Sequence, residues 1–512
     1  MPSVSLTSAE APLVLALDLG TSSFRAITYD ARARAIMGSE EQIPHTPRAT
    51  PDGGVETDAA DLFDLLIRCI DGALHRLGHR EDDLVAVSAS CFWHSLMGVG
   101  TDGEPTTPLL LWADTRSGPM VRQLRRELDP REVQIRTGCL LHSSYWPAKI
   151  RWLKETSPEA FSRSDRFLSF AEYAASRLHG DPRASLSMAS GTGLLAVQEC
   201  SWDQPMLETL DLSADRLPEL TDIDVPLAPL RPRYAERWPA LAGVPWYPAA
   251  GDGACANVGS GAVQPGRMAL TLGTSGAMRI VRTGNDIPIP PGIWAYRLDS
   301  EHYVIGGALS NGGNLLAWLG YMLNVEFDGD AMDDAGRIEP DGHGLTLLPF
   351  IAGERAPAWN DEMSGVVAGL KLATRPEHLI RAGMEAVAYR FARVYDRLCS
   401  VAEEDHQIVA NGGAILRSPA WLRIVADTLG HDLQTLPTDA EVSGRGAAII
   451  ALVASGHVAS FTAAPDASEN QPTYRWHPAS HERYRAARER QRHLESLLFP
   501  DGSAWDQEPE AP

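Results

Sequence analysis

Two short segments of the chain combine glycine with hydroxyl side chains in a pattern that could bind phosphate. Residues 16–22 read ALDLGTS and residues 269–275 read ALTLGTS, so six of seven positions are identical at a spacing of 253 residues. A Gly-Thr-Ser turn between two strands presents backbone N–H groups and hydroxyls in a small concavity, which suits phosphate oxygens. Chance similarity of a strand-turn motif is the alternative, but seven aligned positions, each followed by another strand, favour a duplicated hairpin. The predicted phosphate contacts are Gly20, Thr21, Ser22, Ser23, Gly273, Thr274 and Ser275.

Two carboxylates accompany these segments. The first copy has Asp18 where the second has Thr271, and a carboxylate beside a phosphate loop suits Mg²⁺, which prefers oxygen ligands. Asp252, flanked by glycines shortly before the second copy, could accept the proton of an attacking hydroxyl. A Gly-Asp-Gly sequence can also be only a turn, yet its place between the two copies favours a catalytic base. The residues thus predict phosphoryl transfer from ATP to a hydroxyl.

Other phosphate-binding and catalytic devices are excluded or weakened by the sequence. No lysine follows a glycine, so a GxxxxGK[ST] loop is absent. Residues 251–256 match GxGxx[GA], but a central Asp and the lack of an acidic residue about 20 positions later argue against a dinucleotide site. GxSxG and HExxH are also absent.

Composition sets the class of partner and the compartment. The formal charge of -22, from 67 acidic and 45 basic residues, would repel a nucleic-acid backbone. No stretch approaches the ~20 apolar residues that span a bilayer, and the short apolar run near the N-terminus ends in Asp18 rather than in a cleavage site. The six cysteines form no CxxC pair. We therefore expect a cytoplasmic protein that binds neither nucleic acid nor membrane.

The elements that must position these residues alternate along the chain. Apolar patterns predict strands at 13–17, 24–29, 84–90, 108–112 and 277–281, and helices at 58–77, 147–155, 377–398 and 419–429. Alternation of this kind predicts an α/β fold. A chain of 512 residues exceeds the roughly 250 to 300 that one core supports, so two domains are expected, with the transition in the Gly-rich segment 249–261.

These motifs, in this order, resemble the FGGY carbohydrate kinases of the sugar kinase, Hsp70 and actin superfamily. The opening Asp18-Leu-Gly-Thr-Ser-Ser matches the family's first phosphate loop, and a second signature is present at 365–370 and 378–385. The resemblance implies two actin-like (ribonuclease H-like) domains with an interdomain cleft, ATP and Mg²⁺ as cofactors, and a homodimer as in many relatives. The expected domains are 10–256 and 257–498, with disordered tails at 1–9 and 501–512.

The resemblance also implies roles for individual residues. Asp252 corresponds to the catalytic base and, with Asp18, to a carboxylate near the metal. Gly313 corresponds to a contact with ribose and phosphates. The adenosine motif corresponds to Gly412, Gly413, Ala414 and Arg417, although Arg417 could equally be a solvated charge.

The expected substrate contacts are Trp93 and His94, Trp112, Asp114 and Arg116, together with Asp252. Asp and Arg at alternate positions can hydrogen-bond to a polyol, and a tryptophan face packs on its C–H surface. A Trp-x-Asp-x-Arg segment can instead form a salt bridge at a strand end.

The substrate class stays open between related alternatives. The runs His94-Ser-Leu-Met-Gly and Gly353-Glu-Arg-Ala-Pro-Ala-Trp-Asn look most like gluconate kinases, with xylulose kinases as the alternative. A sugar acid could pair with Arg116 or Lys149, but both also suit neutral sugars. The alternative of another class is an actin-fold protein that binds ATP and polymerises or senses metabolites without phosphorylating anything.

Overall fold

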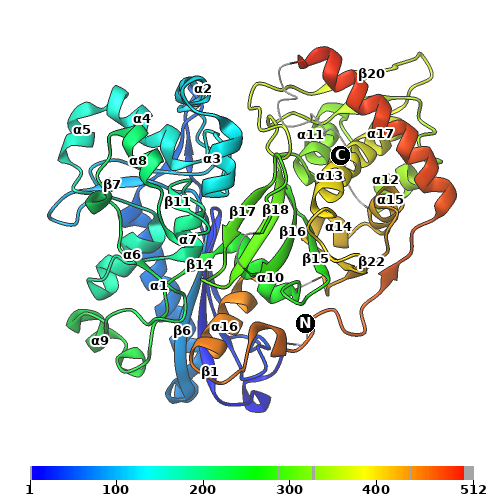
Figure 1. The fold of residues 1–512 in the computed structure, drawn as a ribbon. Helices are drawn as coiled ribbons and strands as arrows, with labels where there is room; N and C mark the ends of the chain where they lie inside the picture. Colours follow the sequence, from blue (N-terminus) through cyan, green and yellow to red (C-terminus); the bar gives the residue numbers. More distant parts are fainter. Residues whose placement is uncertain (1–2, 285–286, 326–328, 439, 501–512) are drawn as a thin grey trace.

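The computed structural model describes residues 3–284, 287–325, 329–438 and 440–500, which form two α/β halves built around separate sheets (Figure 1). The first sheet has the order β14-β6-β1-β2-β3. Its strands are β1 (Leu13–Leu19), β2 (Ser23–Tyr29), β3 (Glu41–Pro44), β6 (Leu84–Cys91) and β14 (Ala250–Gly251). β1 pairs antiparallel with β2 and parallel with β6, and α1 (Ala59–Leu77) packs against β2 and β3.

The second sheet repeats this topology and adds one strand at each edge. Its order is β17-β18-β16-β15-β21-β22-β23. The strands are β15 (Arg267–Leu272), β16 (Gly276–Thr283), β17 (Trp294–Arg297), β18 (His302–Leu309), β21 (Gln407–Asn411), β22 (Leu433–Thr435) and β23 (Thr473–Tyr474). Antiparallel pairing of β15 with β16 and parallel pairing with β21 match the pairing of β1. The shared strand order supports the predicted duplication, and the predicted α/β class with two actin-like domains is confirmed.

Two helices lie between the sheets and join the halves. In Figure 1, α10 (Asp252–Ser260) and α16 (Val442–Ala454) sit side by side near the centre of the molecule. α16 packs on β1 and β6 of the first sheet although it comes late in the chain, and α10 contacts β16 of the second. The boundary predicted between residues 256 and 257 falls inside α10, so it stays a prediction.

The helices predicted from apolar spacing are present with small shifts at their ends. α1 begins after Asp58, whose carboxylate accepts the N–H groups of Ala60 and Asp61 as an N-cap. The other three are α4 (Trp146–Thr156), α13 (Pro376–Leu398) and α15 (Pro419–Leu429). The strand expected at 108–112 is shorter, because only Leu109–Leu110 pair as β8.

The last helix, α17 (Pro478–Leu498), lies against the second half and brings a buried carboxylate to it (Figure 1). Its buried residues, Tyr484, Ala487, Gln491 and Glu495, follow helical spacing along one face. Glu495 accepts hydrogen bonds from Arg390 at 2.5 Å and from Arg393 at 2.7 Å. Arg390 in turn donates to Glu354 at 2.7 Å, so α17 is connected through α13 to the loop that holds residue 354.

The prediction of a disordered N-terminal tail is wrong for residues 3–9. Val4 is buried, and its N–H donates to the carbonyl of Ala35 at 2.9 Å while its carbonyl accepts from Met37. Pairing with the β2–β3 connection therefore orders this segment. Residues 1–2 and 501–512 lie outside the described residues. Within the described part of the chain, no helix has the length and apolarity needed to cross a membrane.

Candidate active site

One cavity of about 260 Å³ brings together residues from both halves of the chain. Thr21 from the first hairpin loop, Ser275 from the second and Asp252 from the start of α10 all line it. Side chains that suit a sugar complete the lining, namely Trp93, His94, Trp112, Ser144, Tyr145, Trp294, Tyr296, Arg279, Arg355 and Trp359. The two loops and the candidate base therefore share one cavity, as the duplicated hairpin predicts.

The two hairpin loops have nearly the same local geometry. The N–H of Gly20 donates to the carbonyl of Ser23 at 3.1 Å, and that of Gly273 donates to the carbonyl of Ser275 at 3.0 Å. Each turn closes with its Thr and Ser outside the strands. Thr274 and Ser22 are exposed, so their hydroxyls are accessible to a ligand.

Asp252 is the first residue of α10, at the positive end of the helix dipole. Its side chain faces the cavity, and Oδ1 accepts the N–H of Gly253 at 2.8 Å. Loss of hydration inside the cleft raises the pKa of Asp252, while the hydrogen bond from Gly253 and the charge of Arg279 oppose that rise. A carboxyl group with a raised pKa is a better proton acceptor than an ordinary aspartate.

Asp18, on β1, is cross-strand neighbour to Arg25 and Ser90. Burial raises the pKa of Asp18 to about 6; Ser90 and Arg25 oppose this shift, and the negative charge of Asp252 adds to it. A divalent cation would favour the ionised form of both groups. The chemistry of these two carboxylates suits Mg²⁺, and their role as its ligands stays a prediction.

The glycines predicted to contact nucleotide come together around the second loop. A Cβ added to Gly313 would lie 2.7 Å from the carbonyl oxygen of Gly273 and 3.2 Å from Cβ of Ala414. Gly412 has φ 103° and lies so close to Leu272 that a Cβ would meet its carbonyl oxygen at 2.6 Å. Gly313 begins α11 (Gly313–Leu323) and Gly413 begins α14 (Gly413–Leu416).

Arg417 lies at the end of α14 and is exposed. A Cβ added to Gly413 would lie 3.5 Å from one terminal nitrogen of Arg417. The guanidinium thus extends over the glycine pair, where it could contact a bound base. Both of its predicted roles, adenine contact and solvated charge, stay open.

Trp93 forms one wall of the cavity. Its indole packs over Gly251, where a Cβ would lie 1.8 Å from the ring, and its Nε1 donates to the carbonyl of Ser187 at 2.9 Å. Tyr296 stacks on Trp294 with a 4.2 Å centroid separation and meets Trp93 edge-on at 4.8 Å. An aromatic wall of this kind suits the C–H face of a carbohydrate.

His94 has φ 70° and is held by a hydrogen bond from Nδ1 to the carbonyl of Gly191 at 2.6 Å. Burial lowers the pKa of His94 to about 3. The imidazole is therefore neutral near pH 7, and Nε2 is left as an acceptor for a substrate hydroxyl.

Asp114 and Arg116 lie outside the residues that line the cavity. Arg116 pairs with Asp114 at 2.5 Å and with Glu56 at 2.6 Å, and Asp114 also accepts the N–H of Val55 at 3.1 Å. The salt bridge between Asp114 and Arg116, which was the alternative interpretation of this segment, is thus present. It fixes the segment that carries Trp112, so substrate contact by these two residues stays a prediction that the cavity does not support.

Lys149 is also occupied within the protein. Its ammonium donates to the carbonyls of His94 and Leu111, each at 2.8 Å, and burial lowers its pKa to about 7. The side chain holds together the two strand ends that carry His94 and Trp112. Neither of the cations proposed from the sequence for a sugar acid therefore faces the cavity.

Sequence reasoning missed several residues that do face it. Tyr145 and Tyr296 join their hydroxyls at 2.6 Å across the two halves, and Arg355 lies 4.9 Å over the ring of Trp112. Arg279 was detectable, since it lies four residues after the second phosphate loop on a strand that must face the cleft. The others come from distant segments, and only the packing of the two halves brings them together.

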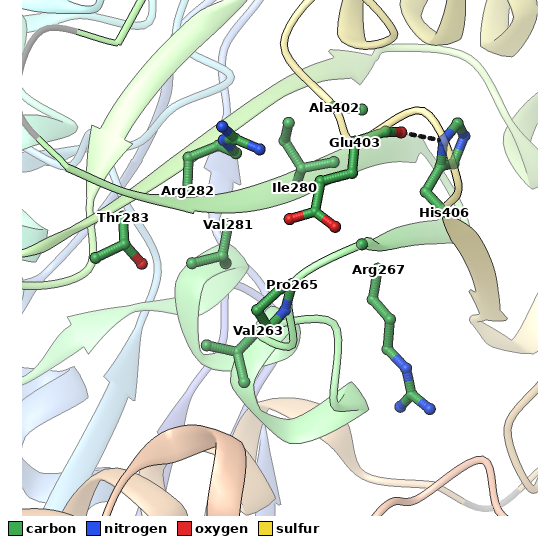
Figure 2. A pocket seen from close by; sticks show the side chains of 11 residues that line it. Val263, Pro265, Arg267, Ile280, Val281, Arg282, Thr283, Ala402, Glu403 and His406 are labelled. Atoms are coloured by element: carbon green, nitrogen blue, oxygen red, sulfur yellow. Dashed lines mark hydrogen bonds between the residues drawn. The ribbon is translucent and has the colours of Figure 1, made fainter.

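A second pocket lies apart from the cavity that contains the two loops and Asp252. It is lined by Arg267 at the start of β15 and by Arg282 on β16, with Glu403 and His406 opposite (Figure 2). The carbonyl of Glu403 accepts a hydrogen bond from Nδ1 of His406 at 2.8 Å. Because β15 runs from Arg267 to Leu272, this pocket lies at the end of the hairpin opposite to the phosphate loop.

Comparisons with known proteins agree with this geometry. Residues 13–259 match the N-terminal domain, and residues 268–455 the C-terminal domain, of the FGGY family of carbohydrate kinases. The chain is 29% identical to a gluconokinase of Bacillus subtilis, covering 88% of this chain and 90% of that protein. It is 31% identical to a xylulose kinase of Streptomyces rubiginosus, covering 86% and 88%.

The fold is also that of solved structures. A gluconate kinase from Lactobacillus acidophilus superposes with a TM-score of 0.87 at 24% identity, covering 97% of this chain and 99% of the other. Since both domain models match in sequence order around one shared cavity, the chain belongs to the FGGY family of carbohydrate kinases and is an ATP-dependent sugar kinase.

Proposed function

We propose that the chain phosphorylates a small sugar acid, with gluconate favoured, by transfer of the γ-phosphoryl group of ATP. The observation that carries this proposal is the single cavity in which Thr21, Ser275 and Asp252 meet an aromatic sugar-binding wall. The similarity to gluconokinases supports gluconate. The similarity to a xylulose kinase keeps a pentulose as the alternative.

In the proposed reaction, Asp252 orients the acceptor hydroxyl and takes its proton as the oxygen attacks phosphorus. The backbone and hydroxyl groups of the two loops stabilise the phosphate oxygens where negative charge develops. Mg²⁺, when bound at Asp18 and Asp252, would neutralise phosphate charge.

The sugar end of the cavity orients the acceptor. Neutral His94 accepts a hydrogen bond from a substrate hydroxyl through Nε2, and the indoles of Trp93 and Trp112 pack on the carbon chain. Closure of the two halves around α10 and α16 would exclude water, which otherwise competes as the phosphoryl acceptor.

The experiment is a measurement of ADP release by the purified protein with gluconate, xylulose, ribulose, glycerol and erythritol. Gluconate should give the highest kcat/KM. A higher value with xylulose would replace the proposed substrate by the alternative. Release that is equal with every compound and with none would favour an ATP-binding protein without kinase activity.

The setting of the enzyme is also part of the proposal. We infer a cytoplasmic enzyme, in agreement with six cysteines that are all free thiols, and a homodimer that binds no nucleic acid. Light scattering of the purified protein checks the dimer, and a monomeric mass at micromolar concentration would contradict it.

A further inference from the structure

Two arginines of the second half, Arg279 and Arg355, are the cations of the cavity. Among its described lining residues the only carboxylate is Asp252, and His94 is neutral near pH 7. Two positive charges and one negative charge leave the cavity with a net charge of +1 before substrate binds. Burial of an uncompensated charge is unfavourable, so the cavity is electrostatically suited to an anion.

The guanidinium of Arg279 uses only one of its N–H donors in a hydrogen bond to the described residues. It projects from β16, is 8% exposed, and donates to a single described acceptor, the hydroxyl of Thr271, at 3.3 Å. Its stem passes Gly306, where a Cβ would lie 2.7 Å from Cγ of Arg279 and 3.0 Å from the ring of Trp294. The guanidinium therefore lies beside the aromatic wall that faces the sugar.

The hydrogen bonds of Arg355 to the described residues are likewise incomplete. One terminal nitrogen donates to the carbonyl of Leu309 at 2.9 Å, and its Nε is buried without a hydrogen-bond partner among the described residues. Its guanidinium stacks on Trp112 at 4.9 Å. A buried donor left unpaired costs free energy, which a ligand oxygen would recover.

Other buried arginines of the chain donate hydrogen bonds to several acceptors each. Arg390 pairs with Glu354 and Glu495. Arg297 donates to the carbonyls of Val197 and Ser300 and to the hydroxyl of Tyr303. Within the described residues, Arg279 and Arg355 have no such set of acceptors, although they are the two arginines that line the cavity.

We propose that Arg279 and Arg355 form the carboxylate-binding subsite that makes the enzyme select a sugar acid over a neutral sugar. This inference rests on the proposed function, which it deepens by naming the residues that recognise the acid. Bidentate arginine geometry matches a carboxylate. In an aldonic acid, the carboxylate lies at the opposite end of the carbon chain from the terminal hydroxyl. A Cβ added to Gly253 would lie 3.1 Å from Nε of Arg279, so Arg279 lies near the start of α10, but neither arginine forms an ion pair with Asp252 within the described residues.

The test compares gluconate with gluconamide, a neutral amide of the same carbon chain. In the unaltered protein, kcat/KM for gluconate should exceed that for gluconamide by roughly 100-fold. Arg279→Met and Arg355→Met should each remove most of this ratio, mainly through a higher KM for gluconate. The KM for ATP should stay within about two-fold. Arg279→Lys keeps the positive charge but loses the planar pair of donors that matches a carboxylate. This variant should recover part of the preference for gluconate over gluconamide.

Arg282→Met is the matched control, because Arg282 is on the same strand but lines the distant pocket (Figure 2). It should leave the ratio unchanged. ADP affinity, measured by calorimetry, shows that each variant is folded.

Three outcomes would overturn the inference. The first is an equal kcat/KM for gluconate and gluconamide in the unaltered protein, a result that requires no variant to fold. The second is an equal loss on both substrates, or a raised KM for ATP, in the arginine variants, which would assign these side chains to phosphate. The third is retention of the ratio in both methionine variants. If the unaltered protein instead prefers xylulose to gluconate, the proposed function itself fails.

Discussion

The two copies of the hairpin share their backbone but carry opposite charges into the cleft. In the first copy, Asp18 lies one residue before the end of β1, whose parallel neighbour, β6, leads into Trp93 and His94. In the second, Thr271 occupies the equivalent position, accepts a hydrogen bond from Arg279, and pairs with β21, which leads into Gly412. The strand order is therefore the same in both copies, but the first presents a carboxylate, which suits a cation, and the second presents an arginine, which suits an anion.

The largest effect is expected at Asp252, the carboxylate that lies between the two copies. Asp252→Asn removes the proton acceptor but keeps the size of the side chain and a polar group at the start of α10. We expect kcat to fall by about 10³-fold, while ADP affinity changes little. Stopped assays of ADP formation and calorimetry measure the two quantities. Near-normal turnover in this variant would remove Asp252 from the mechanism.

A matched pair of substitutions at the equivalent strand ends tests the difference in charge. Asp18→Asn should lower kcat by roughly 100-fold, because a group that stabilises developing charge is lost, and high Mg²⁺ should restore part of the activity. Thr271→Val, at the corresponding position of the second copy, should cost less and show no rescue by Mg²⁺. Similar losses in both variants, with the same Mg²⁺ dependence, would show that the two copies are not specialised in this way.

Substitution of the two loop glycines should affect different properties, namely stability in one copy and nucleotide binding in the other. A Cβ at Gly20 would lie 3.0 Å from the carbonyl oxygen of Ser23, whereas a Cβ at Gly273 meets nothing within 4 Å. Gly20→Ala should therefore destabilise the fold by about 1 kcal/mol. Gly273→Ala should leave unfolding unchanged and act only on the KM for ATP. Denaturant unfolding and steady-state kinetics on both variants give the comparison, and equal unfolding midpoints would contradict it.

The smallest expected effect is a dependence of stability on pH that only the first copy should show. Burial raises the pKa of Asp18 from its ordinary value of 3.8 to about 6, so between these pH values the folded chain binds more protons at this group than the unfolded chain. Stability from this group is present at low pH and is lost as pH rises through 6. Without metal, Asp18→Asn should therefore raise Tm at pH 7.5, and the gain should vanish near pH 4. Thermal unfolding in chelator measures both values, and a constant gain across the range would contradict the assignment.

Local sequence patterns were sufficient to predict those parts of the site that are formed by residues close together in the chain. Apolar runs around the repeated Gly-Thr-Ser segments predicted both hairpins, and the flanking glycines drew attention to Asp252. The environment of the cations was not predictable in this way, because Arg116 and Lys149 have partners in Glu56 and in two backbone carbonyls. No spacing rule reveals such pairing, since the partners come from separate elements. Arg355 likewise reaches Trp112 only through the packing of the two halves.

The C-terminal helix α17 lies beyond residue 455, where the match to the family's second domain ends. A chain trimmed at that residue would keep every matched motif but would lose Glu495, a buried partner of Arg390. Arg390 also holds Glu354, the residue directly before Arg355. The stretch of sequence that matches the family's two domains is therefore shorter than the stretch on which these ion pairs depend, and the part of the chain after residue 455 supplies a buried carboxylate to the network that holds the residue before Arg355.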